Sequence, residues 1–350
     1  MPDLLLGLKC TLAISTYQAG KIIFLSPKDT DSLIQLPRTF AKPMGITEDV
    51  EGDRLAIACK DEILVLANST ELAEYYPPSP NKYDALYMPR TTHHTSGLDV
   101  HDVRFGQGGK IYAVNTLFSC IMQVDDKFNF VPYWMPPQID ALVSEDRCHL
   151  NGMVMVNGLP RYATAFNEGN AHASWRETLT TSGVVWDIEK NEVIASGLGM
   201  PHSPRIFGEH LYVLESAKGC LTRIDLASGA QEKVVEYEGF LRGMSLHKDY
   251  LFIGLSKLRK NSSTFGKLPF AEKANEAGIL IYHLPTASFA GKITYNTSVD
   301  EIYDVHVLAD KMRPNILNTL KEDYKLGLMT PNATYWGKKA ENDIKPQQKI

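Results

Sequence analysis

Cysteine is scarce in this sequence, and its placement excludes two kinds of site. Only five of the 350 residues are cysteine, and they form no CxxC pair. Zinc ribbons and thiol redox motifs need such closely spaced pairs, and an odd number of widely spaced cysteines does not predict a disulfide framework. We expect reduced and mostly buried thiols at Cys10, Cys59, Cys120, Cys148 and Cys220.

Long apolar segments and runs of like charge are missing as well. No stretch approaches the roughly 20 apolar residues of a transmembrane helix, and the first residues, MPDLLLGLKC, lack the basic start of a signal peptide. The 36 basic and 41 acidic residues are mixed along the chain, and the net charge is −5. We therefore predict a cytoplasmic protein that binds neither a membrane nor nucleic acid.

Short cofactor motifs are also lacking. The sequence contains no HExxH and no EF-hand loop. GGK at 108–110 follows FGQ in a predicted hairpin turn, without the strand–loop–helix context of a phosphate-binding loop. The sequence therefore predicts no nucleotide cofactor.

What the sequence does contain is a unit that recurs about every 50 residues. Each unit has a short inner segment, a strand, a turn and a further strand; for example, His101-Asp102-Val103 precedes KIYAVNT (110–116) and CIMQVDD (120–126). This period, with three or four short strands per unit, predicts an all-β, six-bladed β-propeller. The six inner segments begin at Met44, His101, Asn151, His202, Arg242 and Tyr303.

The two ends of the chain complement each other. EIYDVHVL (301–308) is an inner segment without a complete pair of strands after it, whereas TLAIST (11–16) and KIIFLS (21–26) are strands without an inner segment before them. Pairing them in one blade closes the ring and leaves no open sheet edge. We predict a single propeller domain over residues 1–312 and a helical or irregular tail over 313–350.

Three segments interrupt the repeat. Residues 75–98 are rich in Pro and Tyr and are predicted to form a loop across one face, where His93 and His94 could cap the channel. Residues 167–182 and 257–277 split the strand pairs of two blades. The first of these inserts carries Trp175, which either faces a ligand or packs in a satellite cluster.

Polar side chains on the inner segments are predicted to meet in the central channel, because the first strand of each blade lines it. A divalent metal, Zn-like or Ca-like, is one use for this set, since neutral imidazoles from different strands can converge on an ion. The candidate metal ligands are His101, His149, His202, His306, Asn151 and Asp304. The candidate catalytic residues are Arg242 as an anion anchor, Tyr303 as a proton donor and Asp102 as a partner that orients an imidazole. A polar channel that holds only water is the alternative.

Six segments resemble an uncharacterised bacterial family of β-propellers, catalogued as a domain of unknown function. They are LAISTYQAGKIIFL (12–25), HDVRFGQGGKIYAVNTLFSCI (101–121), EDRCHLNGM (145–153), MPHSPR (200–205), FLRGM (240–244) and EIYDVHVL (301–308). This resemblance implies the fold and no activity. The architecture is more distantly similar to gluconolactonase-like and strictosidine-synthase-like six-bladed propellers and to the peptide-amidating lyase, in which a metal lies in the channel. None of their ligand motifs is complete here, so no catalytic role is carried over.

Two functions follow as hypotheses. The first is a metal-dependent hydrolase, lyase or isomerase that acts on a small polar or anionic substrate in the channel. The second is a non-enzymatic scaffold that binds a protein or glycan through the face loops 75–98 and 257–277. In either case we expect a small-molecule or protein ligand at the channel mouth.

Overall fold

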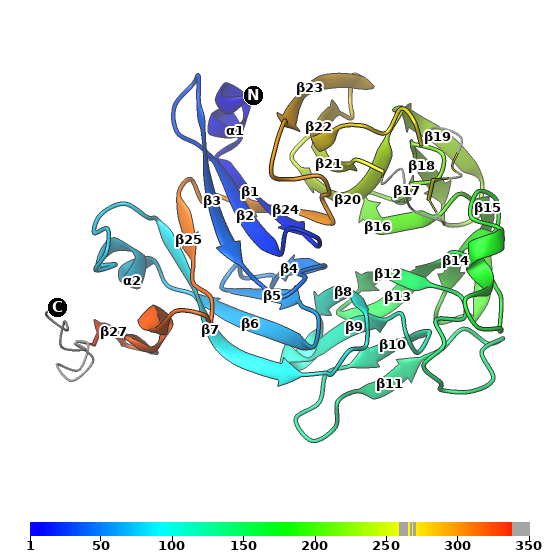
Figure 1. Ribbon diagram of the computed structural model, residues 1–350, viewed down its shortest axis with the longest axis horizontal. Helices are drawn as coiled ribbons and strands as arrows, with labels where there is room; N and C mark the ends of the chain where they lie inside the picture. Colours follow the sequence, from blue (N-terminus) through cyan, green and yellow to red (C-terminus); the bar gives the residue numbers. More distant parts are fainter. Residues whose placement is uncertain (259–264, 267, 269–270, 338–350) are drawn as a thin grey trace, which may run out of the picture.

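The computed structural model describes residues 1–258, 265–266, 268 and 271–337. Six antiparallel blades surround a central axis, as Figure 1 shows. The predicted all-β, six-bladed propeller is therefore confirmed. No helix within the described ranges is long and apolar enough to cross a membrane.

Each blade begins with the strand nearest the axis. Blade 1 consists of β24 (Asp304–Ala309), β1 (Cys10–Thr16), β2 (Lys21–Pro27) and β3 (Leu33–Thr39). Blade 2 consists of β4 (Ile46–Glu48), β5 (Arg54–Ala58), β6 (Glu62–Asn68) and β7 (Ala85–His94). Blade 3 consists of β8 (Val100–Phe105), β9 (Ile111–Asn115), β10 (Cys120–Gln123) and β11 (Val131–Trp134). Blade 4 consists of β12 (Leu150–Val156), β13 (Leu159–Ala165), β14 (Gly183–Asp187) and β15 (Glu192–Leu198). Blade 5 consists of β16 (Pro201–Phe207), β17 (His210–Glu215), β18 (Cys220–Asp225) and β19 (Gln231–Glu236). Blade 6 consists of β20 (Phe240–His247), β21 (Tyr250–Ser256), β22 (Ala277–His283) and β23 (Ser288–Tyr295).

The ring closes through blade 1, as the sequence predicts. Strand β24 from the far end of the chain pairs antiparallel with β1, so that Val307 lies opposite Leu12 and Val305 lies opposite Ile14 (Figure 1). The ladder of hydrogen bonds leaves no unpaired edge where the two ends meet. Closure by strands from both termini is therefore confirmed.

The hydrophobic core consists of separate clusters between neighbouring blades. Between blades 1 and 6, for example, Leu12 and Ile14 pack with Ile279 and Ile281. Five comparable clusters fill the other interfaces. Since the alternate residues of each strand face opposite neighbours, every blade is held from both sides. This arrangement leaves the axis itself free for polar side chains.

The innermost strands approach one another very closely. A Cβ atom on Gly152 would lie 2.4 Å from Cδ of Pro204 in the next blade. A Cβ atom on Gly243 would lie 2.6 Å from Cα of Asp304, and the φ of this glycine is +78°. Side chains other than hydrogen do not fit at these positions. The glycines of the inner segments therefore set the narrow radius of the channel.

The pairing of four inner strands is irregular near the polar residues of the inner segments. The pairing register shifts between Val100 and Val103 in β8, and comparable shifts occur in β12, β16 and β20. A bulge interrupts the alternation of side chains along a strand and turns neighbouring residues toward new directions. Consecutive residues such as His101 and Asp102 can therefore both take part in the channel.

The predicted face loop at 75–98 is wrong for residues 85–94. Residues 85–94 form β7, the outer strand of blade 2, and His93 and His94 pair with Ile63 and Glu62 of β6. Pro89 is tolerated because β7 lies at the outside of the blade and its ladder has a register shift beside this residue. Helix α2 (Thr70–Glu74) precedes the remaining irregular part of the segment.

The segment after residue 312 also differs from the helical or irregular tail that was expected. Strand β25 (Pro314–Ile316) pairs parallel with β7 and adds a fifth strand to blade 2. A hairpin of β26 (Gly327–Thr330) and β27 (Ala333–Trp336) follows. The remaining helical elements are short: α1 (Pro2–Leu8), η1 (Gln107–Gly109), η2 (Ser174–Glu177) and η3 (Glu322–Lys325).

Candidate functional site

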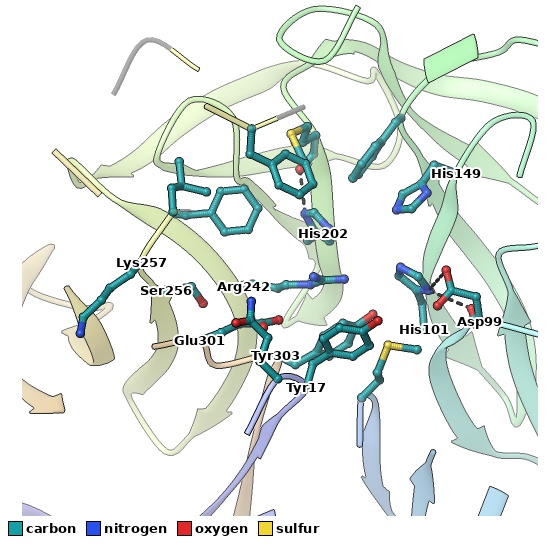
Figure 2. A pocket seen from close by; sticks show the side chains of 17 residues that line it. Tyr17, Asp99, His101, His149, His202, Arg242, Ser256, Lys257, Glu301 and Tyr303 are labelled. Atoms are coloured by element: carbon teal, nitrogen blue, oxygen red, sulfur yellow. Dashed lines mark hydrogen bonds and ion pairs between the residues drawn. The ribbon is translucent and has the colours of Figure 1, made fainter. Parts of the chain in front are cut away.

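A cavity of about 520 Å³ opens at one end of the channel. Its size lies within the range of ~300–1,000 Å³ that is typical of small-molecule sites. Its lining includes five polar residues, each from a different inner strand or from the segment that leads into it (Figure 2). We call these five residues the channel pocket. They are His101, His149, His202, Arg242 and Tyr303.

The hydrogen bonds of His101 and His202 determine which ring nitrogen carries a proton. Nδ1 of His101 lies 2.9 Å from the carbonyl oxygen of Asp99, and Nδ1 of His202 lies 3.0 Å from that of Met200. A carbonyl oxygen only accepts hydrogen bonds, so each Nδ1 must donate. Each Nε2 is consequently an unprotonated acceptor, and Figure 2 shows both rings directing it toward the cavity.

Burial keeps these two imidazoles neutral. Desolvation lowers the pKa of His101 to about 4, and it holds the pKa of His202 well below its usual value. The Arg242 guanidinium and the neighbouring histidines act in the same direction on both rings. At neutral pH the two side chains therefore present lone pairs and no charge.

A buried serine fixes His202 from behind. Oγ of Ser216 lies 2.7 Å from Nδ1 of His202 and donates its own hydrogen to the carbonyl oxygen of Leu241. The hydroxyl must therefore accept from His202, which agrees with the tautomer derived from Met200. The sequence did not predict this contact, because Ser216 directly follows β17 and does not belong to an inner segment.

His149 is held in a different way. Its Nδ1 lies 2.9 Å from a carboxylate oxygen of Asp146, which also accepts a hydrogen bond of 3.0 Å from the indole of Trp175. The ring packs against Phe166 and Trp175 and lies edge-on to His101, with ring centroids 4.9 Å apart. Trp175 is buried, so it is a packing partner of the site and not a ligand-facing residue.

Arg242 lies over the face of Tyr303. The centre of its guanidinium is 3.7 Å from the ring centroid, which is a close cation–π contact. Burial raises the pKa of Tyr303 well above its usual value, so its hydroxyl stays protonated. Within the described part of the chain, Arg242 has no ion-pair or hydrogen-bond partner, so its N–H groups remain available to a ligand.

Apolar residues that the sequence analysis missed form one wall of the cavity. Phe166 and Phe240 both lie edge-on to His202, and Phe265 contacts Phe240. Phe265 comes from the insert 257–277, of which residues 259–264, 267 and 269–270 lie outside the described structure. Of these three residues, Phe240 lies two positions before the predicted Arg242, in the segment FLRGM, and could have been noticed.

Beneath the channel pocket lies a second group of four residues, which we call the charge layer. It consists of Asp102, Arg104, Arg205 and Asp304. Asp102 pairs with Arg104 at 3.0 Å, and Arg205 lies 3.7 Å from both Asp102 and Asp304. The two carboxylates also accept backbone N–H groups from neighbouring blades, those of Met153 and Ile46.

The predicted metal ligands therefore separate into different places. Asn151 donates to the carbonyl oxygen of His149 and accepts from Thr164, and His306 lies 3.9 Å from Glu48, away from the channel pocket. Asp304 belongs to the charge layer, and only the three remaining histidines share the cavity. Across the described residues, no group of three or more His, Cys, Asp or Glu side chains is placed to hold a metal ion. The metal site stays a prediction.

Comparison with solved structures shows the fold and no more. A chain in the crystal structure of a nidogen/laminin complex aligns with a TM-score of 0.57 at 12% identity, over 86% of this chain and 99% of that chain. A putative 6-phosphogluconolactonase from Bacteroides fragilis aligns with a TM-score of 0.47 at 13% identity, over 85% of this chain and 97% of that chain. No curated protein matches the sequence significantly.

One family model matches residues 1–317, which include all six blades and the whole channel pocket. The match agrees with the resemblance noted in the inner segments. The chain therefore belongs to the family described as Domain of unknown function (DUF4915).

Proposed function

We propose that the channel pocket is the active site of a hydrolase, lyase or isomerase that acts on a small anionic substrate. The observation that carries this proposal is Arg242, a guanidinium without a carboxylate partner in the described structure, in one cavity with three imidazoles. Arg242 is half-buried, so its guanidinium has lost part of its hydration and lacks a negative charge in the described structure to compensate that loss. A bound anion supplies that compensation.

The imidazoles supply the means for proton transfer. His101 and His202 present unprotonated Nε2 atoms to the cavity, and the Asp146 carboxylate orients His149. A nitrogen lone pair of this kind can take a proton from a substrate or from a water molecule, and the electron pair of the broken bond stays on the substrate or oxygen. Tyr303 is a protonated hydroxyl that donates to a substrate oxygen.

Binding of simple anions tests the anchor. Isothermal titration calorimetry with lactate and inorganic phosphate should detect binding to the full chain, weakened at least ~10-fold in Arg242→Gln. Arg223→Gln, which changes an arginine paired with Glu232 on the surface, is the matched control and should bind as the unchanged protein does. Equal binding by both variants would show that Arg242 is not an anion anchor.

A divalent metal is a separate prediction, and no step above depends on one. Metal analysis of the purified protein tests it directly. One equivalent of metal that disappears when His101 and His202 are both replaced by alanine would establish the predicted site. Trace metal that is indifferent to this double substitution would refute it.

The alternative of a binding scaffold has one observation in its favour. Exposed apolar side chains gather where α2 packs against the C-terminal hairpin, since Leu328 and Tyr335 lie opposite each other on that hairpin and Tyr75 follows α2. Such exposed groups are typical of contact surfaces. Under this alternative, a partner captured by the full chain would be lost on Tyr75→Ser and Tyr335→Ser but retained by Arg242→Gln.

A further inference from the structure

We propose that the substrate is a carboxylic acid with an aromatic body and a hydroxyl or amino group on the carbon next to the carboxylate. This inference rests on the proposed function, because it describes the ligand of the same channel pocket. Three features of the pocket specify the three parts of the molecule: the free edge of Arg242, the lone pairs of the imidazoles and the aromatic wall.

Arg242 specifies the carboxylate. Because Tyr303 covers one face of the guanidinium at 3.7 Å, the N–H groups in the plane of the guanidinium are the ones left to a ligand. Two parallel N–H donors match the two oxygens of a carboxylate in that plane. The stacking contact therefore fixes the orientation in which the acid is received.

The charge of the cavity favours a carboxylate over a phosphate dianion. Lys257, the other basic residue on the lining, is paired with Asp300 at 2.7 Å, and burial keeps His101 and His202 neutral. His149 faces the carboxylate of Asp146. The lining also carries the carboxylates of Asp99 and Glu301. The cavity therefore has no surplus of positive charge for a dianion, and Arg242 matches a single carboxylate better than a phosphate.

The imidazoles specify the hydrogen-bond donor. Nδ1 of His101 and Nδ1 of His202 both donate to backbone carbonyls, so their Nε2 atoms can only accept. A ligand that offered only acceptors would leave these lone pairs unmatched and dehydrated. A hydroxyl or amino group next to the carboxylate places a donor within reach while Arg242 holds the acid.

The aromatic wall of the cavity specifies the apolar body of the ligand. Phe166, Phe240 and Phe265 follow one another around His202 with ring centroids 5.1–6.1 Å apart along the chain of contacts. Met44 and Met200 add flexible apolar surface to the same cavity. Aromatic rings and thioethers favour a flat apolar group that stacks or meets them edge-on.

A matched set of ligands tests each part by calorimetry on the full chain. Phenyllactate and phenylalanine carry all three parts. 3-Phenylpropionate lacks the donor, phenyllactamide lacks the carboxylate, and lactate lacks the aromatic body. We expect the tighter of the first two ligands to bind at least ~10-fold more tightly than each of the last three, and Arg242→Gln to weaken it ~10- to 100-fold, whereas Arg223→Gln does not.

The outcomes separate this inference from the proposed function. If lactate or phosphate binds through Arg242 as tightly as phenyllactate and phenylalanine do, the substrate class is wrong and the anion site stands. If 3-phenylpropionate matches them, the adjacent donor is wrong and the class is overturned. If no ligand of the set and no phosphate binds in a way that depends on Arg242, both proposals fail.

Discussion

The channel pocket and the charge layer use neighbouring residues of the same inner segments for opposite purposes. His101 and Tyr303 line the cavity, whereas Asp102 and Asp304, the next residues along the chain, lie beneath it in ion pairs. Arg205 in the charge layer lies between two carboxylates, but Arg242 in the channel pocket stacks on an aromatic ring.

The difference shows how a propeller separates stability from binding. In the charge layer, carboxylates accept backbone N–H groups of the adjoining blades and thereby fasten the ring. In the channel pocket, polar atoms are fixed from behind by Asp99, Met200 and Asp146, and their inner faces stay available. The buried carboxylates of the charge layer are paired, whereas the half-buried guanidinium of Arg242 keeps N–H groups that a ligand can reach.

The largest expected effect is on the charge layer. Asp102→Ala should lower the free energy of unfolding by about 3–5 kcal/mol, because Arg104 and Arg205 lose a carboxylate and two buried N–H groups lose their acceptor. Urea denaturation measures this change. Glu232→Ala in an exposed ion pair should change the midpoint very little. If Asp102→Ala lowered the free energy of unfolding as little as Glu232→Ala does, the charge layer would not have the structural role that distinguishes it from the channel pocket.

The next effect is a dependence of stability on pH that comes from the channel pocket. The pKa of His101 falls from 6.5 to about 4 on folding, mainly through burial. Between these values the unfolded chain binds a proton that the folded chain does not, so the free energy of unfolding declines as pH falls, by about 3 kcal/mol in all. His101→Gln should remove this part of the pH dependence.

The control for this pH effect is an exposed histidine. His172→Gln should leave the pH profile of the unfolding free energy as it is in the unchanged protein. Parallel profiles for His101→Gln and the unchanged protein would contradict the neutral state assigned to His101.

A smaller loss is expected for the support behind His202. Ser216→Ala removes the acceptor of one hydrogen bond and leaves the buried carbonyl of Leu241 without its donor, at a cost of about 1–3 kcal/mol. Thermal and urea unfolding measure the loss, and Ser196→Ala at an exposed site of β15 is the control. Equal stability of the two variants would mean that water replaces the hydroxyl.

The smallest expected effect on stability is at the residue with the largest expected effect on binding. Arg242→Gln should change the free energy of unfolding by less than about 1 kcal/mol, because the lost cation–π contact is offset by removal of an unpaired charge. Denaturation of the ligand-free protein checks this. A loss comparable to that of Asp102→Ala would place Arg242 among the structural charges.

Much of the fold could be predicted from the repeat. The inner segments, the strand pairs that follow them and the complementary ends at 11–26 and 301–308 are local patterns, and the structure bears them out. Strand β7 was missed because the Pro- and Tyr-rich composition of 75–98 hid it, and because parallel pairing with β25 involves residues more than 200 positions away. Pairing across such a distance leaves no local signal.

The candidate site was predictable only as a set of residues around an axis. Sequence reasoning placed ten side chains in one ring, and it had no basis for dividing them between two levels. For His101 and Asp102 the division coincides with a register shift in β8, and comparable shifts occur in β16 and β20, whereas β24 pairs with β1 without one. These registers arise from the pairing of each strand with its neighbour. The partners that fix each side chain, such as Ser216 behind His202, are likewise tertiary contacts.

By itself, the sequence determined that six short polar segments would meet at the centre of a closed ring, because periodic strand patterns and complementary ends are written locally. Only the tertiary structure decided which of two adjacent residues faces the cavity and which is locked into an ion pair. That choice follows from strand pairing, with a bulge at His101 and Asp102, and from how closely the blades approach. Both depend on packing between parts of the chain far apart in sequence.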